Sequence, residues 1–353
     1  MEFEQNVQAV SKRELLRAVG LFVLTLISVF FVYGYQWTEG DPLRDSETAW
    51  ASVQFSVTLL SILLAHEMGH YWVARAHGFS LSLPVFLPFP FAFGTMGAVI
   101  QLRSLPKNRS ALLEMGAAGP IAGFVCAILA LLYGLPKTEN QKKIQLPDSV
   151  RTELLNKPPV EPGWLDWLVP EQGNSEVLVM LMEDPLLLRA LGNLVLGEPL
   201  SPYALLHPVA FAGWVGALLT AVNMIPVGQL DGGHILNALR PQNALKWSKF
   251  ILGCLVVMGI IFWPGWAMWA LLITVMGAYK PIFIERIDSI SLRALVVAGI
   301  AYVAFGLCFM FRPIGLVAIS FDDIEWVQDV AEEHVEQEVF EQQGANNDMF
   351  KDQ

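Results

Sequence analysis

The sequence predicts an all-α protein that crosses a membrane about six or seven times and carries a small re-entrant β-hairpin. Of its 353 residues, 54% are hydrophobic and only 16% are charged, whereas about a quarter of the residues in soluble domains are charged. Several apolar stretches approach the roughly 20 residues that a helix needs to cross a bilayer. One further apolar stretch is interrupted by prolines and glycines, so it does not fit a continuous helix.

Seven stretches are expected to form membrane-spanning helices: 15–35, 54–77, 110–133, 204–226, 249–262, 265–279 and 292–311. We interpret the first as an uncleaved anchor, because Lys12 and Arg13 precede it and no clear cleavage site follows. The predicted organisation is an anchor helix and outside loop (1–48), a core in two parts (49–135 and 204–245) separated by an insertion (136–203), further helices (246–315) and an acidic tail (316–353).

The charges of the connections predict the orientation in the membrane, because short cytoplasmic loops are enriched in Lys and Arg. Residues 75–109 contain four basic and no acidic residues, and 240–249 contain three basic and no acidic residues, so both are expected inside. The insertion 136–203 contains six basic and ten acidic residues and is expected outside, with an interfacial helix over 184–197. The N-terminus is then cytoplasmic and the acidic tail lies outside.

The net charge of −11 belongs almost wholly to the C-terminal tail. Residues 321–353 hold 11 acidic residues and one basic residue, a net of −10, which leaves −1 for the rest of the chain. This balance argues against nucleic acid as a partner, because binding to phosphates needs clustered Lys and Arg. Apolar residues recur at helical spacing in the tail and predict a solvated, partly helical segment: Ile324, Val327, Ala331 and Val335. The alternative is a docking element for a regulator.

The stretch 79–102 is the predicted β-hairpin. It is strongly apolar, but five residues prevent a continuous helix: Pro84, Pro88, Pro90, Gly94 and Gly97. Residues 96–102 are typical of a strand, and 81–86 are expected to pair with them. A disordered apolar loop would leave backbone amides unsatisfied in lipid, which makes it the weaker interpretation.

The strongest chemical motif is His66-Glu67-Met68-Gly69-His70, inside the second predicted span. On a helix, His66 and His70 stand one turn apart on the same face, so both imidazoles can bind one metal ion. Glu67 lies close enough to contact water at that ion. Ionisable side chains are costly inside a membrane, which favours a functional site over simple polar packing.

A catalytic zinc site usually has three protein ligands, so one more is needed. Asp231 is the first candidate, because it follows the fourth span, and the two glycines after it allow the backbone to turn sharply. His234 is a rival ligand, although packing or an outer hydrogen bond fits it better. The charge count brings both motifs to the cytoplasmic side, where they can meet. His77, His207 and His334 are expected to be ordinary interfacial or surface residues.

Together these motifs resemble the site-2 protease family of intramembrane zinc metalloproteases, peptidase family M50. The resemblance rests on the His66–His70 motif and on Asn223-Met224-Ile225-Pro226 followed by Leu230-Asp231-Gly232-Gly233, and it covers about 50–280. Further similarity lies in 93–97, in the glycine-rich run 116–123 and in 207–214, the last of which resembles the bacterial and plastid branch. We expect Gly119 and Gly123 to serve close helix packing.

The resemblance implies both a site and a function. His66, His70 and Asp231 would bind one zinc ion, Glu67 would be the general base and acid that acts on zinc-activated water, and Asn223 would stabilise the reacting carbonyl. The three core helices would correspond to 54–77, 110–133 and 204–226. The expected activity is hydrolysis of peptide bonds in or near membrane-spanning segments of other proteins, with the hairpin edge holding the unwound substrate. No convincing PDZ domain is found.

Two other functions remain open: a polytopic metal-binding transporter and a pseudoprotease that binds membrane partners without cleaving them. The transporter is disfavoured because no inverted repeats are found. The pseudoprotease is disfavoured because a protein that only binds has no need of Glu67. No evident transit peptide precedes the first span, and Glu2 and Glu4 stand at the start, so a bacterial inner membrane is the expected location.

Overall fold

The computed structural model describes residues 11–38, 40–147, 176–320 and 324–327. The predicted acidic tail beyond Val327 lies outside these residues, as does the middle of the insertion with its prolines and tryptophans. His334 is outside them too. The predictions for a partly helical or regulator-binding tail therefore remain predictions.

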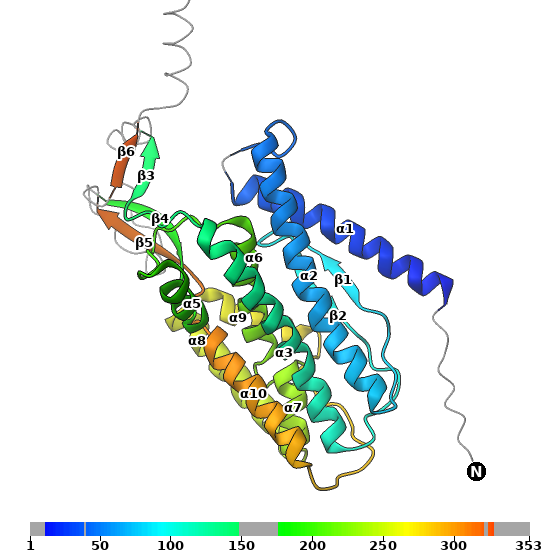
Figure 1. Cartoon of the computed structure of the whole chain (residues 1–353). Helices are drawn as coiled ribbons and strands as arrows, with labels where there is room; N and C mark the ends of the chain where they lie inside the picture. The colour runs from blue at the N-terminus through cyan, green and yellow to red at the C-terminus, as the bar shows by residue number, and fades with distance from the viewer. Residues whose placement is uncertain (1–10, 39, 148–175, 321–323, 328–353) are drawn as a thin grey trace, which may run out of the picture. The chain divides into compact units, whose positions relative to one another are not determined.

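The described residues are mostly helical (Figure 1). The helices are α1 (Lys12–Gln36), α2 (Ser46–Ala76), α3 (Arg109–Gly134), a 3-10 turn (Leu135–Lys137), α5 (Leu186–Leu196), α6 (Pro208–Asn223), α7 (Asp231–Leu239), α8 (Ala244–Ile261), α9 (Pro264–Val275) and α10 (Leu292–Cys308). The strands are β1 (Val85–Pro88), β2 (Thr95–Val99), β3 (Ile144–Pro147), β4 (Glu176–Met182), β5 (Ile314–Ser320) and β6 (Ile324–Val327).

Two compact units divide the chain. The first comprises Met1–Glu139, Glu183–Leu200 and Leu205–Pro313, which include the helices and the β1–β2 hairpin. The second comprises Asn140–Met182, Ser201–Ala204 and Ile314–Gln353, which include strands β3 to β6. The predicted insertion 136–203 is therefore not a unit by itself, because α5 belongs to the helical unit.

Four helices in the described part of the chain are long and apolar enough to cross a membrane: α1, α2, α3 with its 3-10 extension, and α8. Shorter apolar helices form at α5, α6, α9 and α10. The chain is thus a membrane protein by composition, and the predicted total of six or seven spans remains a prediction. The predicted span 54–77 is longer than expected, because α2 begins at Ser46, and the predicted span 204–226 is shorter, because α6 has only 16 residues. Helix α6 begins at Pro208, a residue type that is tolerated in the first turn of a helix. The helix ends at Asn223, ahead of Pro226, because the residue that precedes a proline disfavours the helical conformation.

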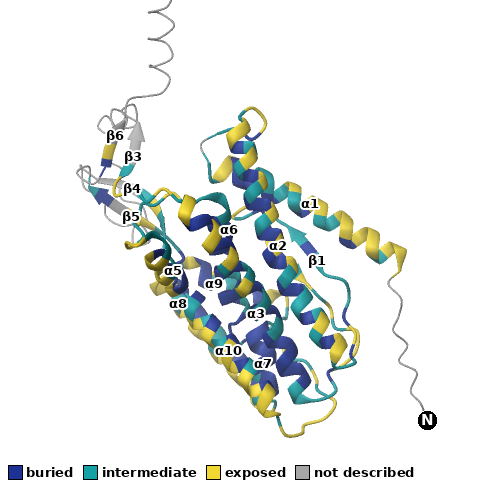
Figure 2. Ribbon diagram, viewed as in Figure 1, coloured by how far each residue is buried: buried dark blue, intermediate teal, exposed yellow. Residues whose placement is uncertain are grey.

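Helix α3 forms the centre of the helical unit. It packs against α2, α6, α7 and α10 (Figure 1), and its buried positions are largely small residues, including Gly116, Ala117, Gly119 and Gly123. Figure 2 shows that α3 and α7 are mostly buried, whereas α1, α8 and α10 present long exposed faces. An apolar outer face of this kind fits lipid as its surroundings.

The predicted hairpin is present between α2 and α3. Strands β1 and β2 pair antiparallel, from Val85 opposite Val99 to Pro88 opposite Thr95, with an irregular step between them. A separate bridge joins Leu81 to Leu102. The strands are thus displaced by a few residues from the predicted 81–86 and 96–102, and the position of the hairpin in the membrane remains a prediction.

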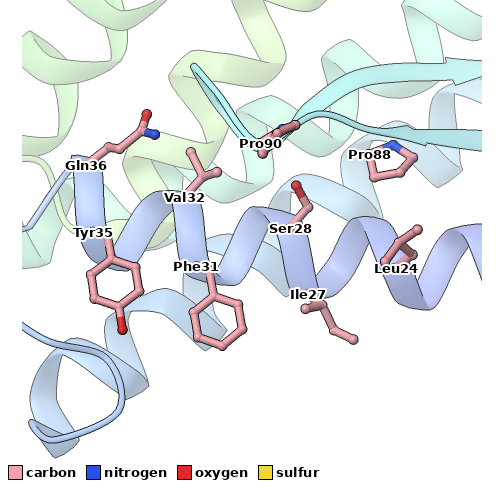
Figure 3. Close-up of a pocket in the computed structure, with 9 residues that line it drawn as sticks. All are labelled: Leu24, Ile27, Ser28, Phe31, Val32, Tyr35, Gln36, Pro88 and Pro90. Atoms are coloured by element: carbon pink, nitrogen blue, oxygen red, sulfur yellow. The ribbon is translucent and has the colours of Figure 1, made fainter.

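Helix α1 is fastened to the hairpin at both ends. Near its start, Glu14 accepts a hydrogen bond from the Leu83 amide (3.2 Å) and pairs with Arg103. Near its end, the Trp37 indole N–H donates to the Ala92 carbonyl (2.7 Å). Between these attachments lies an apolar cavity of about 510 Å³ (Figure 3), lined by Leu24, Ile27, Ser28, Phe31, Val32, Tyr35, Gln36, Pro88 and Pro90.

The second unit joins the insertion to the segment after α10. Strands β4 and β5 pair antiparallel over seven residues each, and β3 pairs with β6 in parallel. Ile319 and Ile324 form its small buried core. The tail was predicted to be helical around Ile324 and Val327, and this part of the prediction is wrong: both residues belong to β6. The expected location of these two segments outside the membrane remains a prediction.

Candidate metal centre

Helix α2 carries the first two candidate ligands. Its N-terminus is capped by the Asp45 carboxylate, which accepts hydrogen bonds from the Glu47 and Thr48 amides (3.1 and 2.9 Å). The helix then continues for 31 residues, so His66 and His70 follow each other by one turn well inside it. His66, Glu67 and His70 are all buried, with 5–6% of each residue exposed.

The turn between α6 and α7 brings the third candidate, Asp231. A Cβ added at Gly232 would lie 2.0 Å from the Met224 carbonyl oxygen, and one at Gly233 would lie 2.4 Å from the Val227 carbonyl oxygen. Only glycine permits so close an approach, so α7 can fold back directly on the chain that leaves α6. The carboxylate of Asp231, the first residue of α7, thereby reaches α2.

The three candidate ligands converge on one point. His66 Nε2 lies 3.0 Å from Asp231 Oδ2, His70 Nε2 lies 3.1 Å from Asp231 Oδ1, and the two imidazole nitrogens lie 3.2 Å apart. One ligand atom from each residue falls within 4.8 Å of the others. Asn223, at the end of α6, has its amide nitrogen 3.5 Å from His66 Nε2.

The hydrogen bond of His70 to α3 shows why this cluster suits a cation. His70 Nδ1 lies 2.8 Å from the Met115 carbonyl oxygen, which can only accept, so Nδ1 carries the proton. In a neutral His70, Nε2 then directs a lone pair at the Asp231 carboxylate and at His66. A cation placed among this nitrogen, the carboxylate and His66 Nε2 would be stabilised by the lone pairs that they can direct at it. Two imidazole nitrogens and a carboxylate are also a typical donor set of catalytic zinc.

A glycine stripe on α3, formed by Gly116, Gly119 and Gly123, gives these imidazoles their space. A Cβ on Gly119 would lie 2.1 Å from His70 Nε2, and one on Gly123 would lie 3.1 Å from His66 Nδ1. The sequence predicted that these glycines serve close helix packing, and the structure shows what they pack against. Any larger residue at Gly119 would occupy the position of the candidate ligand.

The far end of α7 is held by Arg109, a residue that no sequence motif indicated. Its guanidinium donates to the Ala238 and Leu239 carbonyls (2.6 and 2.8 Å) and to the Asp288 carbonyl (3.1 Å). These first two carbonyls are at the C-terminal end of α7, where a positive charge is favourable. Arg109 thus fixes the short helix that carries Asp231.

Two other histidines, His77 and His207, lie apart from the cluster. His77 Nε2 lies 3.0 Å from the buried Glu114 carboxylate, which Arg293 also approaches (3.4 Å). His207 caps α6 and accepts a hydrogen bond from the Val209 amide (3.3 Å). The interfacial roles predicted for these two histidines fit such contacts, and neither belongs to the group of three.

Comparison with known proteins identifies the family. The family model described as peptidase family M50 matches residues 54–262, which contain all the candidate ligands. The chain belongs to peptidase family M50. This agrees with the resemblance to site-2 proteases and with the predicted enzyme class, a zinc metalloprotease.

Relatives of this M50 member carry the same enzyme class in their names. It is 31% identical over 214 residues to "Probable zinc metalloprotease EGY1, chloroplastic" of Arabidopsis thaliana. The matched region covers 60% of this chain and 33% of the relative. It is 31% identical over 181 residues to "Probable zinc metalloprotease EGY2, chloroplastic" of Oryza sativa subsp. indica, with 51% and 28% covered. The chain thus spans about a third of the length of these relatives.

Among solved structures, the M50 chain matches a site-2 protease from Methanocaldococcus jannaschii. The match has a TM-score of 0.34 and 16% sequence identity, and it covers 76% of this chain and 92% of the other.

Proposed function

We propose that this protein is an intramembrane zinc metalloprotease that hydrolyses peptide bonds in or near membrane-spanning segments of other proteins. The observation that carries the proposal is the convergence of His66, His70 and Asp231 within 4.8 Å. Two of the three belong to α2, a helix long and apolar enough to cross a membrane. A hydrolytic site on a helix that crosses the membrane would reach substrates that are themselves in the membrane.

The residues would hold one zinc ion through His66 Nε2, His70 Nε2 and the Asp231 carboxylate. When bound, zinc would supply a Lewis acid that polarises the scissile carbonyl and makes water more acidic. Glu67 is the one further carboxylate in the His66–His70 turn. Its role in the proposal is to take a proton from the attacking water and return it to the leaving amine.

Asn223 has the second catalytic role in the proposal. Its amide N–H would donate to the oxygen on which negative charge develops during attack. Groups of this kind contribute about 2.7–4 kcal/mol to transition-state stabilisation. The contact of Asn223 with His66 supports the assignment, because it places the amide beside the ligand cluster.

The substrate would be bound in extended form along the hairpin, because a helical segment hides its carbonyls in internal hydrogen bonds. An exposed strand edge can accept a peptide as an added strand. Gln101 is not a free edge position, since its amide donates to Ser82 Oγ (2.9 Å). Val99, which is 45% exposed, is the better test position. Val99→Pro should lower cleavage and leave zinc content unchanged, with Val99→Ala as the control; unchanged cleavage in Val99→Pro would sink the hypothesis.

The orientation follows from the charges of the loops. The basic connections 75–109 and 240–249 adjoin the ends of α2 and α7, so we place the metal toward the inner, basic side of the membrane. The predicted bacterial inner membrane finds no support among these relatives, whose names describe them as chloroplastic.

The experiment that tests the function uses the full chain purified in detergent. Bound zinc is measured together with cleavage of single-span membrane substrates, for the wild type and for Asp231→Ala. We expect one zinc per chain and cleavage in the wild type, and loss of both in the variant. Zinc without cleavage of any substrate would indicate a pseudoprotease, and metal flux in proteoliposomes without cleavage would indicate a transporter.

A further inference from the structure

His234 is a buried histidine that the proposed mechanism does not use. It lies on α7 one turn after Asp231, and only 7% of the residue is exposed. Its Nδ1 atom is covered and has no hydrogen-bond partner among the described residues. Buried polar atoms without a partner are rare in proteins, so each calls for an explanation.

The position of His234 connects it to the candidate ligands. A Cβ added at Gly116 would lie 2.9 Å from His234 Cβ and 3.1 Å from the Asp231 backbone oxygen. His70 lies against Gly119 and His66 against Gly123 on the same face of α3. Three histidines therefore follow one another along the glycine stripe, His234 through its Cβ and the two candidate zinc ligands through their rings.

The covered Nδ1 determines the tautomer of His234. A proton on Nδ1 would be a buried donor without an acceptor, which is costly. A neutral imidazole carries one proton, so the favourable tautomer has it on Nε2. His234 is then a neutral hydrogen-bond donor through Nε2–H.

Asp231 needs such a donor once a metal ion is bound. In the structure, its two carboxylate oxygens face His66 and His70. When those imidazoles direct their Nε2 lone pairs at zinc, neither of them can donate a hydrogen bond to Asp231 through Nε2. A carboxylate that binds zinc through one oxygen then leaves the other oxygen to be satisfied, and partners of metal ligands commonly fill this role.

We propose that His234 is a positioning residue whose Nε2–H donates, directly or through one water, to the Asp231 oxygen that does not bind zinc. This inference rests on the proposed zinc site. It also assigns His234 a role other than the ligand role that the sequence left open, since the group of mutually close ligand atoms contains His66, His70 and Asp231 without His234.

Three substitutions of one residue test the inference. A glutamine amide can reach about where the histidine Nε2 lies, an asparagine amide reaches only about as far as Nδ1, and leucine has no donor. Zinc affinity is measured on the full chain in detergent by competition with a chelator. We expect His234→Leu and His234→Asn to weaken zinc binding about 10–100-fold, the usual effect of losing an outer partner. His234→Gln should stay close to the wild type.

Two further measurements separate positioning from packing. The thermal unfolding of the metal-free protein should be similar for the Gln and Asn variants. The absorption spectrum of the cobalt-substituted protein should differ from that of the wild type in His234→Asn and His234→Leu but not in His234→Gln. His77→Leu and His77→Gln are the matched controls, because this histidine pairs with Glu114 away from the cluster; both should bind zinc normally.

Several results would overturn the inference. Wild-type zinc affinity in all three His234 variants would leave no role for the donor, and equal losses in all three would indicate packing. A loss as large as that of Asp231→Ala would make His234 a ligand. A wild-type chain that binds no zinc would overturn the proposed function and this inference with it.

Discussion

The candidate metal centre and the α1–hairpin region differ in how deeply their helices are buried. At the metal centre, α2, α3 and α7 approach so closely that added Cβ atoms at several glycines would collide with neighbouring atoms. In the most apolar stretch of α3, 50% of the residues are buried inside the protein. In the corresponding stretch of α1, 17% of the residues are buried. Helix α1 contacts the hairpin through hydrogen bonds near its two ends and through Val29, whose Cα would lie 2.4 Å from a Cβ added at Gly94. An open pocket of about 510 Å³ lies beside these contacts.

This difference separates two tasks. A metal site requires ligands held within fractions of an ångström, which close packing of glycine-rich helices provides. The proposed membrane substrate would require a place to enter and unfold, which a largely exposed helix and a strand edge can provide. Changes in the metal centre should therefore affect zinc affinity, whereas changes in the α1–hairpin region should affect substrate turnover alone.

The largest expected effect is that of Gly119→Ala. The new methyl group would lie 2.1 Å from His70 Nε2, so the imidazole must leave its position. We expect zinc affinity to fall about 100-fold or more, the upper range for disturbed metal sites, and cleavage to fall with it. Chelator competition measures the first and a cleavage assay the second.

Gly20→Ala is the matched control for Gly119→Ala. Gly20 also lies in a helix, but nothing lies within 4 Å of an added Cβ there. Zinc affinity should be unchanged, and helix propensity favours alanine by about 1 kcal/mol. Normal zinc binding in Gly119→Ala would contradict the close contact between α3 and His70.

The next effect is that of Arg109→Met, which removes the anchor at the end of α7. Without the hydrogen bonds to the Ala238 and Leu239 carbonyls, the helix that carries Asp231 is held less firmly. We expect zinc to bind about tenfold more weakly, near the lower end of outer-partner effects. Arg293→Met, which removes an exposed cation near Glu114, should leave zinc affinity unchanged. A lower unfolding temperature with normal zinc affinity would restrict Arg109 to a structural role.

A smaller effect is expected for Trp37→Phe in the α1–hairpin region. The substitution keeps a ring that can stack on Phe93 but removes the hydrogen bond to the Ala92 carbonyl. One neutral hydrogen bond contributes about 0.5–1.5 kcal/mol, so kcat/KM for a membrane substrate should fall about 2–10-fold at unchanged zinc content. Trp247→Phe, on the exposed face of α8, is the control. Loss of zinc in Trp37→Phe would contradict the prediction that the α1–hairpin region affects substrate turnover and not zinc binding.

The smallest effect is expected at Asp184, which belongs to neither region. Its ionisation should make the stability of the protein depend on pH. Burial raises the pKa of Asp184 to about 6, with Arg189 opposing and Glu183 adding to the shift. Because the folded state then holds the proton more tightly than the unfolded state, stability should fall as pH rises from about 4 to 7. In Asp184→Asn this part of the dependence should disappear, as thermal unfolding at pH 5 and pH 8 would show.

The pH dependence of stability that is expected from Asp45 has the opposite sign to that expected from Asp184. Hydrogen bonds from the Thr48 side chain and backbone lower the pKa of Asp45, so its contribution to stability is lost as pH falls. Asp45→Asn should therefore remove a dependence that runs in the other direction. Identical pH profiles for the two variants would contradict these assignments.

The sequence predicted much of the candidate site for a physical reason. Two histidines four residues apart must share a helix face, so His66 and His70 were predictable from spacing alone. Spacing alone did not decide between Asp231 and His234; the glycines beside Asp231 favoured it, and the family resemblance added to that preference. The role of the glycine stripe was missed in part, because sequence does not reveal which side chains a neighbouring helix will present to Gly119.

Long-range pairing accounts for the main error. Residues 314–320 pair with 176–182 across more than 130 residues of chain, and no local pattern identifies such partners. The three-residue spacing of Ile324 and Val327 fits one face of a helix and not one face of a strand, yet the pairing with β3 makes this segment a strand. Arg109 was likewise unpredictable, since its partners lie about 130 residues later.

The most direct test of the central claim is the comparison of Glu67→Gln with the wild type in zinc content and cleavage. Glutamine matches glutamate in size but does not accept a proton, and general acid–base groups contribute about 10²–10⁴-fold to rate. The account predicts one zinc per chain in both proteins and a loss of cleavage of at least about 100-fold in the variant. Equal cleavage by the two proteins, or loss of zinc in Glu67→Gln, would contradict it.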